Sequence, residues 1–497
     1  MNLNPLRIFA EPQLEFASGQ LLEHPRDGLT LFGPFDSKGI HKPRHIRYGA
    51  IGTSGGLAAA RLFFSSLRRS IQTDEALDSV LWPHFPGFEE AFHAIFPETS
   101  TWEEQIDQVQ LETLARQADR HARVFGVTDA YLEAIRRAKR SDAVCDVYVC
   151  VVPDLIWKNC RPKSRFADAL GTSPTNKQIE LRRHMDDMFD GYKSDQYEYS
   201  IDFRRQIKAR VMEFDVPIQI VRESTLSLVR PKFGERQITE LSDRAWNIST
   251  AMYYKSGGKP WKLSGARDGV CYVGVAFKNT EDGSQNACCA AQMFLDDGDG
   301  VVFLGDEGKW KSERKGEFHL SKESAKRLLA GILRTYDEQH GKPLKEIFLH
   351  CRSTLNDEEY SGYLDACPKG VKLVGIRVAP DRSGVRLYRT GTRPVLRGSF
   401  WQLSERHGYL WGSGFKPRLR TYDGSEVPVP LAITIQHGDA SLEQVAHDIL
   451  GLTKLNYNAS KLGEFQPVTI RFSEEVGEIL VANRKAGKRH PNFKYYI

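Results

Sequence analysis

Four side chains in the middle of the chain have types and a spacing suited to binding a concentrated negative charge. Arg204 and Lys208 are four residues apart, so a helix over this segment would place both on one face. Gln219 follows eleven residues after Lys208, where its side-chain amide can donate to the same group. Lys255 adds a third cation near the expected end of a later helix. Together the four residues predict a site for a terminal phosphate.

The same spacing has a plainer interpretation. Two basic residues four apart on a helix often form only a solvated face, with no ligand involved. The pair Arg204 and Lys208 does not by itself distinguish a phosphate site from such a face.

Other groupings that could carry chemistry are weaker. Asp296, Asp297 and Asp299 are spaced somewhat like a calcium loop, but the EF-hand spacing and its closing glutamate are missing, so a hairpin turn is expected. His350 is expected to be a strand residue, and no Ser-His-Asp or Cys-His grouping is legible. The eight cysteines form no CxxC pair and no cluster at zinc spacing, which indicates reduced, buried thiols.

The elements that must position the basic residues follow an α/β order. The run DAVCDVYVCVVPD (142–154) is continuously apolar, as expected for a strand buried on both faces of a parallel sheet. Helical residues and a second short strand, in EFDVPIQIVRES (213–224), come next. Strand, helix and strand in this order predict an α/β sandwich.

A helix end is also legible. In YYKSGGKPW (253–261), Gly257 and Gly258 can adopt left-handed conformations and Pro260 blocks continuation. The helix should therefore end near Lys255.

A second α/β block follows. GVCYVGVAF (269–277) is typical of a buried strand, and residues 290–306 predict two strands around an Asp- and Gly-containing turn. Ser321 can cap a helix with apolar residues at helical spacing, and strands follow at 346–351 and 373–378. Mixed strands, a helix and further strands form the order of an RNase H-like domain.

The N-terminal part is less regular. PRDGLTLFGPFD (25–36) contains Asp-Gly and Gly-Pro pairs around short apolar runs, which favours strands and turns. Residues 101–140 are rich in Glu, Gln, Ala, Leu and Arg, which favours helix.

Composition sets the broad class. The 497 residues are too many for one ordinary core, and 40% hydrophobic with 27% charged residues is typical of a globular protein. A formal net charge of +5 permits a nucleic-acid partner without requiring one. No apolar run is long enough for a membrane span and no signal peptide is visible, so we expect a cytoplasmic protein without a membrane partner.

The order of the motifs resembles one family. Arg204, Lys208, Gln219 and Lys255, with KSGGKPW, resemble the guide 5′-phosphate motif of the Argonaute MID domain. Two departures are Ile218, where many members have Thr or Cys, and Arg204, where Tyr or His is frequent. Arg keeps a donor for phosphate, whereas stacking on the first base is put in doubt.

Later segments are similar to the PIWI domain of the same family. YVGVAF and FLHCRSTLNDEEYSGY resemble its first two motifs, and LTKLNYNAS followed by QPVTIRF resembles its last. The segment PRDGLTLFGPF is similar to the opening of short prokaryotic Argonautes, which lack the N and PAZ domains. The resemblance implies a mixed α/β N-terminal region packed on MID, a Rossmann-like MID domain and an RNase H-like PIWI domain. We expect these at residues 1–141, 142–262 and 263–497.

The resemblance also implies that the PIWI nuclease site is lost. Where the family places catalytic aspartates, this chain has Ala276 and, by alignment on His350 and the acidic run, Arg352. Alanine cannot bind a metal ion and arginine would repel one. The last motif offers only the amides of Asn456 and Asn458. Glu307 is a weak candidate for the glutamate finger, the fourth residue of such a site, whose position the alignment does not settle.

The end of the sequence carries a further expectation. NFKYYI is apolar and aromatic up to Ile497, unlike the polar termini that are usually disordered. In the resembled family the C-terminal carboxylate lies between MID and PIWI and helps to hold a metal beside the guide phosphate. Ile497, with Gln219 nearby, is therefore expected to help bind a structural Mg²⁺. Simple burial of an apolar tail is the alternative.

The resemblance implies a function in defence. Such a chain holds a guide RNA and pairs it with complementary single-stranded DNA from plasmids or phages. It forms a heterodimer with an APAZ-containing protein carrying a TIR or sirtuin-like effector, whose activation depletes NAD and kills the infected cell. GTSGG (52–56) lacks the spacing of a dinucleotide loop, so NAD chemistry is expected on the partner. Which effector is present, the preferred first nucleotide and any oligomer formed on activation are left open.

Two other hypotheses are kept. A self-sufficient guided nuclease would cut a matched target with manganese or magnesium and no partner. An α/β protein unrelated to nucleic acids would carry the basic residues as surface decoration.

Overall fold

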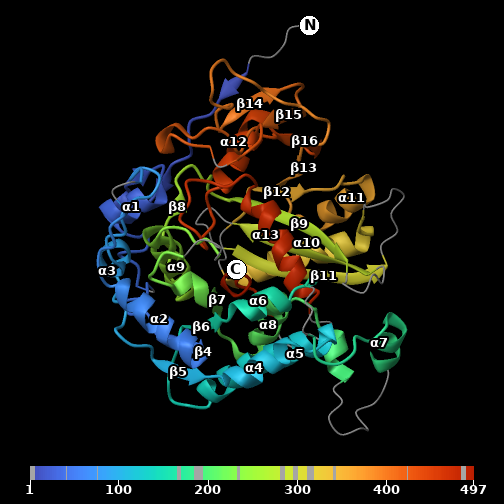
Figure 1. The fold of residues 1–497 in the computed structure, drawn as a ribbon. Helices are drawn as coiled ribbons and strands as arrows, with labels where there is room; N and C mark the ends of the chain where they lie inside the picture. The colour runs from blue at the N-terminus through green and yellow to red at the C-terminus, as the bar shows by residue number, and fades with distance from the viewer. Residues whose placement is uncertain are drawn as a thin grey trace.

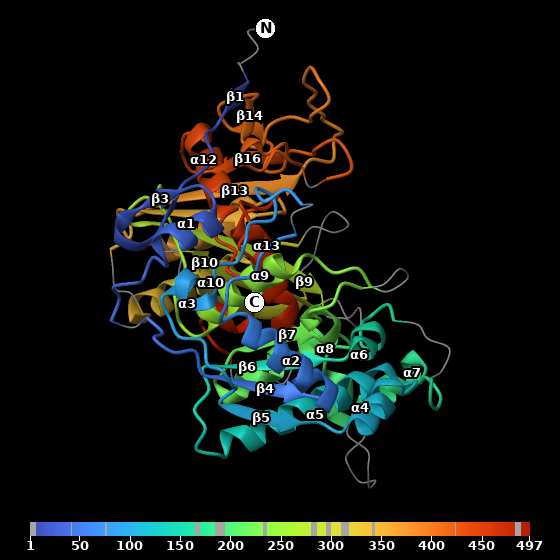
Figure 2. The same ribbon diagram turned by 60° about the vertical axis from the view of Figure 1, so that its left-hand side comes forward.

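Two sheets of different kinds organise the computed structural model. It describes residues 6–40, 42–74, 77–164, 169–183, 194–231, 236–279, 286–294, 300–309, 318–339, 343–422, 424–482 and 489–497. In both views the C-terminus lies between the two sheets, whereas β1 (Arg7–Ile8), the first described strand, lies at the far end of the larger one (Figures 1 and 2). The α/β fold class that the sequence predicts is confirmed.

The smaller of these sheets, called the parallel sheet here, has four strands among the described residues, in the order β5-β4-β6-β7. All its neighbouring strands pair in parallel. The strands are β4 (Tyr48–Gly52), β5 (Trp102–Gln105), β6 (Val147–Val152) and β7 (Ile218–Arg222).

Helices cover both faces of the parallel sheet, because its central strand β6 is apolar at every position. Val147, Val149 and Val151 pack towards α2 (Ser54–Ser66) and α9 (Leu241–Lys255). Tyr148 and Cys150 pack on the other side. There the covering helices are α4 (Gln108–Ala115), α5 (Arg120–Lys139), α6 (Asp154–Asn159) and α8 (Phe203–Val211).

Half of the parallel sheet comes from residues before 142. β4 pairs directly with β6, which lies almost a hundred residues later, because both strands are apolar and buried on both faces. The boundary expected between residues 141 and 142 therefore falls inside one sheet. Residues 101–140 are also not wholly helical, since Trp102–Gln105 pairs with β4 as strand β5 before the helices begin.

The larger sheet has nine strands among the described residues, in the order β1-β14-β15-β16-β13-β12-β9-β10-β11. β9 pairs antiparallel with β10 and parallel with β12, and β12 continues parallel to β13. The strands are β1 (Arg7–Ile8), β9 (Val270–Asn279), β10 (Asn286–Phe294), β11 (Gly300–Lys309), β12 (Glu346–Cys351), β13 (Lys372–Pro380), β14 (Ser399–Gln402), β15 (His407–Leu410) and β16 (Leu431–His437). This confirms the predicted order of an RNase H-like domain.

Successive side chains of β9 point to opposite faces of the larger sheet, and helices cover both faces. Cys271, Val273 and Val275 pack against α10 (Lys322–Gln339) and α11 (Asp357–Ala366). Tyr272 faces the core shared with α12 (Leu442–Leu452) and α13 (Val468–Leu480). As predicted, Ser321 accepts a hydrogen bond from the backbone N–H of Ser324 at the start of α10.

Glycine lets α13 approach β9 closely. A Cβ added at Gly274 would lie 1.8 Å from the carbonyl oxygen of Thr469. Any other residue at this position would push the helix off the sheet.

The N-terminal residues pair with later parts of the chain, and these pairs include strands of the larger sheet and of a third, small sheet. β2 (Leu14–Glu15) pairs with β3 (Leu21–Leu22) and with β8 (Lys262–Leu263), so the boundary expected between 262 and 263 falls within a strand. The expectation of strands and turns at 25–36 was wrong, because Pro25–Phe32 forms helix α1. Proline is favoured in a first helical turn, and the His24 side chain accepts the N–H of Arg26.

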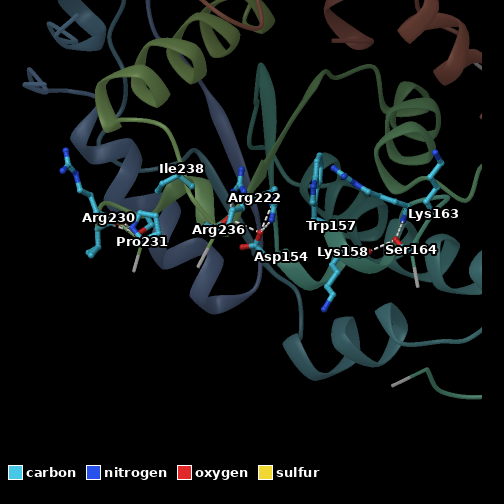
Figure 3. A pocket seen from close by; sticks show the side chains of 14 residues that line it. Asp154, Trp157, Lys158, Lys163, Ser164, Arg222, Arg230, Pro231, Arg236 and Ile238 are labelled. Atoms are coloured by element: carbon cyan, nitrogen blue, oxygen red, sulfur yellow. Dashed lines mark hydrogen bonds and ion pairs between the residues drawn. The ribbon is translucent and has the colours of Figure 1, made fainter. Parts of the chain in front are cut away.

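A cavity of about 1070 Å³ lies where the chain leaves the carboxyl ends of β6 and β7 (Figure 3). Asp154, just after β6, and Arg222, at the end of β7, are among its lining residues.

Candidate functional site

The two helices that carry the predicted basic residues form for local reasons. Asp202 caps α8 by accepting the backbone N–H of Arg205 at 3.1 Å, which fixes the start of the helix beside Arg204. α9 ends at Lys255, and Gly257 has the left-handed φ of 99° that the sequence predicts.

The structure brings Gln219 and Lys255 into contact. Gln219 lies on β7, in register with Val149 of β6. The Nζ atom of Lys255 donates to the Gln219 Oε1 atom at 2.5 Å. This bond joins the end of α9 to the edge strand of the parallel sheet.

Lys208 and Arg204 complete the group, called the basic cluster here (Arg204, Lys208, Gln219 and Lys255). The Lys208 Nζ atom donates to the carbonyl oxygen of Tyr496 at 2.8 Å, and Arg204 Nη2 lies 3.1 Å from Glu475 Oε2. Both lysines are almost fully buried, at 2% exposure for Lys208 and 1% for Lys255.

The basic cluster has a surplus of positive charge. Burial, and after it the neighbouring Arg204 charge, lower the pKa of Lys255 to about 7. Burial, followed by the charges of Arg204 and Lys255, lowers the pKa of Lys208 well below its usual range. Within the part of the chain that the structure describes, no carboxylate forms an ion pair with either lysine. An arrangement of this kind favours an added anion.

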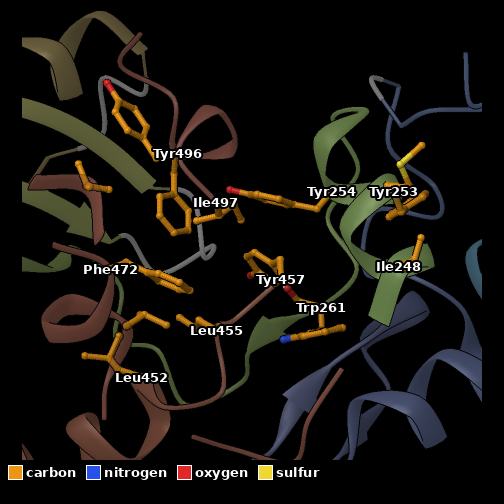
Figure 4. Packing of buried hydrophobic residues seen from close by; sticks show 14 of the residues in the cluster. Ile248, Tyr253, Tyr254, Trp261, Leu452, Leu455, Tyr457, Phe472, Tyr496 and Ile497 are labelled. Atoms are coloured by element: carbon orange, nitrogen blue, oxygen red, sulfur yellow. Dashed lines mark hydrogen bonds between the residues drawn. The ribbon is translucent and has the colours of Figure 1, made fainter. Parts of the chain in front are cut away.

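The last residues of the sequence are part of this site. Ile497 is 2% exposed, and Figure 4 shows it directed towards Tyr254 of α9. The Tyr254 ring packs in turn on Tyr457, with ring centroids 4.6 Å apart. Because Lys208 bonds to the Tyr496 carbonyl, the chain end lies one residue from the basic cluster.

Sequence reasoning did not find two members of this site. The Tyr496 carbonyl lies 288 residues from Lys208, and the Glu475 carboxylate lies 271 residues from Arg204. No sequence pattern near these residues predicts either contact. Only the apolar run before Ile497 indicated that the end of the sequence is buried.

Ala276 and Arg352, which the family resemblance places where catalytic aspartates would be, lie side by side, Ala276 within β9 and Arg352 just after β12. Cys351 of β12 is in register with Val275 of β9, so the next residues, Arg352 and Ala276, follow side by side. Both line a cavity of about 710 Å³. Arg352 forms an ion pair with Glu474 of α13, which occupies that carboxylate.

Within the described residues, no alternative acidic centre fills this cavity. Among the residues that the structure describes, no three His, Cys, Asp or Glu side chains are grouped so that they could hold a metal ion. Asp381 also lines the cavity, where Ser383 donates to it at 2.7 Å. Of the residues named from the sequence, Asp296, Asp297, Asp299 and the side chain of Glu307 lie outside the described part.

Two further residues have structural contacts. Burial lowers the pKa of His350 to about 3, and its Nδ1 atom lies 2.8 Å from Thr469 Oγ1, as suits a buried strand residue. The Asn456 amide donates to Glu464 at 3.0 Å. Neither residue lines the cavity beside Ala276.

The GTSGG segment opens a helix directly after a strand. Thr53 caps α2 by accepting the N–H of Gly56 at 3.1 Å, and its hydroxyl donates to Glu223 at 2.7 Å. A carboxylate therefore already lies at this helix N-terminus, where a phosphate would otherwise be favoured.

Comparison with known proteins identifies the fold. No protein-family model and no curated protein match the chain. The structure is similar to Clostridium butyricum Argonaute bound to a guide DNA and a 19-mer target DNA, with a TM-score of 0.62, 16% identity and 97% of this chain covered. It is also similar to Drosophila Piwi, with a TM-score of 0.58 and 13% identity, and to Aquifex aeolicus Argonaute, with 0.59 and 15%. Each of these two comparisons covers 99% of this chain.

The chain spans about half the length of these structures, from 54% to 57%. Sequence identities this low establish the fold alone, which is Argonaute-like. In the described part of the chain, no helix has the length and apolar character required to cross a membrane.

Proposed function

We propose that this chain binds the 5′-phosphorylated end of a guide strand in the basic cluster and uses the guide to recognise a complementary target. The observation that carries the proposal is the burial of Lys208 and Lys255 with no carboxylate in an ion pair with either one among the described residues; the charge of Glu475 acts on Lys208, but Glu475 is paired with Arg204. A terminal phosphate supplies the missing negative charge and accepts hydrogen bonds from both lysines. The guide and target DNA bound to the similar Clostridium butyricum protein support the same assignment.

The finer proposal is that the guide is RNA and the target is single-stranded DNA from a plasmid or phage. Base pairing between the two strands reads the sequence, while the protein contacts the backbone. The resemblance of the sequence motifs to short prokaryotic Argonautes supports this choice. A protein that reads only the guide end needs no base-specific side chains along the target.

A structural Mg²⁺ fits this site only together with the phosphate. Arg204, Lys208 and Lys255 are positive, so a dication alone would be repelled. A guide phosphate and the Ile497 carboxylate would offset that positive charge. The side-chain carbonyl oxygen of Gln219, once it no longer accepts a hydrogen bond from Lys255, is the kind of neutral ligand that Mg²⁺ accepts. The ion would screen the phosphate from the carboxylate and so tie the chain end to the guide.

We further propose that this chain does not cut its target. Two-metal hydrolysis needs carboxylates that hold both ions around the cut phosphate. Ala276 offers only a methyl group, and Arg352 adds a positive charge at the neighbouring position. The cavity therefore suits a bound backbone better than a pair of divalent ions.

Target recognition would then be relayed to a second protein. We propose an APAZ-containing partner with a TIR or sirtuin-like effector, whose NAD hydrolysis protects the population by killing the infected cell. The family resemblance supports this partner. The Glu223 carboxylate at the N-terminus of α2 supports leaving NAD chemistry to that partner, because it occupies the position that a dinucleotide phosphate would take on this chain.

The test compares 5′-phosphorylated and 5′-hydroxyl guides of one sequence. Lys208→Ala with Lys255→Ala should weaken binding of the phosphorylated guide by at least about a hundredfold, since each of the two lost bonds to a charged group is worth roughly 1.5–3 kcal/mol. The hydroxyl guide should change little. The matched control Lys326→Ala with Lys369→Ala removes two exposed lysines outside the cluster and should preserve the preference.

Equal losses for both guides would refute the phosphate site. A separate measurement is sequencing of nucleic acid purified with the chain from cells. Short RNAs with 5′ phosphates are expected. A chain that emerges free of nucleic acid, and is indifferent to added phosphorylated strands, would favour the unrelated α/β protein.

A further inference from the structure

The cavity at the carboxyl ends of β6 and β7 is distinct from the basic cluster. Its described lining residues lie within residues 154–164 around α6, and within residues 222–231 and 236–238 at and after the end of β7. None of Arg204, Lys208, Gln219 or Lys255 lines it. Ligands of open parallel sheets bind outside the carboxyl ends of the strands, which is where this cavity lies.

The cavity is strongly basic. Among the described residues, one carboxylate, Asp154, lines it against six basic side chains: Lys158, Arg161, Lys163, Arg222, Arg230 and Arg236. Arg222 donates from Nε to Asp154 at 2.7 Å, and Arg230 lies within ion-pair distance of Asp74 and Glu240.

The other four cations have no such partner. In the described part of the chain, no carboxylate forms an ion pair with Lys158, Arg161, Lys163 or Arg236. Burial, together with the charge of Arg222, lowers the pKa of both Arg161 and Arg236. Repulsion among these guanidinium groups would be relieved by a ligand with more than one negative charge.

An aromatic ring organises the guanidinium groups. The Arg161 guanidinium carbon lies 3.8 Å from the centre of the Trp157 ring, and that of Arg222 lies 5.2 Å from it. Arg236 is held by Ser224 and Thr225, with distances of 2.5 and 3.2 Å from Nη1 to their hydroxyl oxygens. Positioned planar donors of this kind bind phosphate in two-point contacts.

One side of the cavity carries apolar side chains beside Arg230. Figure 3 shows Pro231 and Ile238 on one side, Arg222 and Arg236 in the middle, and Trp157 towards the other side. Val229, near Pro231 in sequence, also lines the cavity. A bare phosphate would use only the basic half, whereas a ligand that joins phosphates to a flat apolar ring would use both.

We propose that this cavity is a second nucleotide site, in which Arg161, Arg222 and Arg236 hold the phosphates and the apolar side chains hold the base. Its volume is of the order of known small-molecule sites, about 300–1,000 Å³. The ligand is either a free nucleoside polyphosphate or a nucleotide within a bound strand, which present the same chemistry. The site does not depend on guide binding at the basic cluster.

The test uses the full chain, freed of nucleic acid, and fluorescently labelled ATP followed by anisotropy. Lys158→Glu with Lys163→Glu reverses two exposed charges of the cavity and should weaken binding at least tenfold. The matched control Lys326→Glu with Lys369→Glu makes the same charge change on exposed lysines outside the cavity. The affinity of this control for labelled ATP should stay within about threefold of the wild-type value, because salt screens charges that lie far from the ligand.

Competition separates the sources of the nucleotide. Displacement by unlabelled ATP at lower concentration than by tripolyphosphate shows that the base is bound and supports the site. If a 5′-hydroxyl oligonucleotide displaces the label at still lower concentration, the nucleotide belongs to a strand; if it does not, the ligand is free. Equal weakening by the cavity and control variants, or equal displacement by tripolyphosphate and ATP, would overturn the proposal.

Discussion

Lys255→Met should stabilise the protein in the absence of a guide, because it removes a cation that is buried without an ion-pair partner among the described residues. The pKa of Lys255 falls from an ordinary 10.5 to about 7 in the folded chain. A difference of this size corresponds to roughly 5 kcal/mol of penalty on the charged form. Methionine has a similar length and carries no charge, and the lost bond to Gln219 offsets only part of the gain.

The effect should depend on pH in a defined direction. Below about pH 7, Lys255 is protonated in both the folded and the unfolded chain, so the full penalty is present. As pH rises from 7 towards 10.5, the unfolded chain binds the proton that the folded chain releases, and the penalty shrinks. At pH 9 roughly 2 kcal/mol of it should remain.

Thermal unfolding of the guide-free wild type and variant at pH 6 and pH 9 measures this. The variant should melt several degrees higher at pH 6, with a smaller difference at pH 9. The control is Lys326→Met, which removes an exposed lysine of α10 and should leave the melting temperature nearly unchanged at both pH values. A Lys255→Met variant that is less stable than the wild type at both pH values would refute the reasoning.

Two further predictions concern the larger sheet. Ala276→Asp alone should give no cleavage of a guide-matched target with Mn²⁺ or Mg²⁺, because Arg352 at the neighbouring strand end opposes a metal; robust cutting would show that Ala276 has been aligned wrongly. Gly274→Ala should lower the free energy of unfolding by about 3 kcal/mol, since the added Cβ would clash with the Thr469 carbonyl. In the control Gly265→Ala, the added Cβ meets no atom within 4 Å, so the free energy of unfolding should not change. Equal melting temperatures for the two glycine variants would show that α13 moves away from β9 without cost.

The sequence by itself was enough for features that arise within a few turns or strands. Helical spacing placed Arg204 and Lys208 on α8, and the glycine pair after Lys255 predicted where α9 ends. Continuous apolar runs predicted β6 and β9, because strands buried on both faces have no polar alternation. The order of these elements was sufficient for the α/β class.

Local patterns misled where partners lie far away. Residues 25–36 contain turn-forming pairs, yet the chain forms α1 there because Pro25 and the His24 cap favour a first helical turn. Residues 102–105 lie in a segment of helix-forming composition, but pairing with β4 makes them a strand. Tertiary pairing outweighs propensities of a few tenths of a kcal/mol per residue.

What only the tertiary structure decided is the electrostatic state of the site. The residue types at positions 208 and 255 are visible in the sequence, but their burial and the absence of a described counterion are not. That state arises because α8, α9, β7 and the chain end at Tyr496 meet around two lysines. A charge costs little in water and much in a protein interior, so the same two side chains favour an added anion only once the fold has buried them.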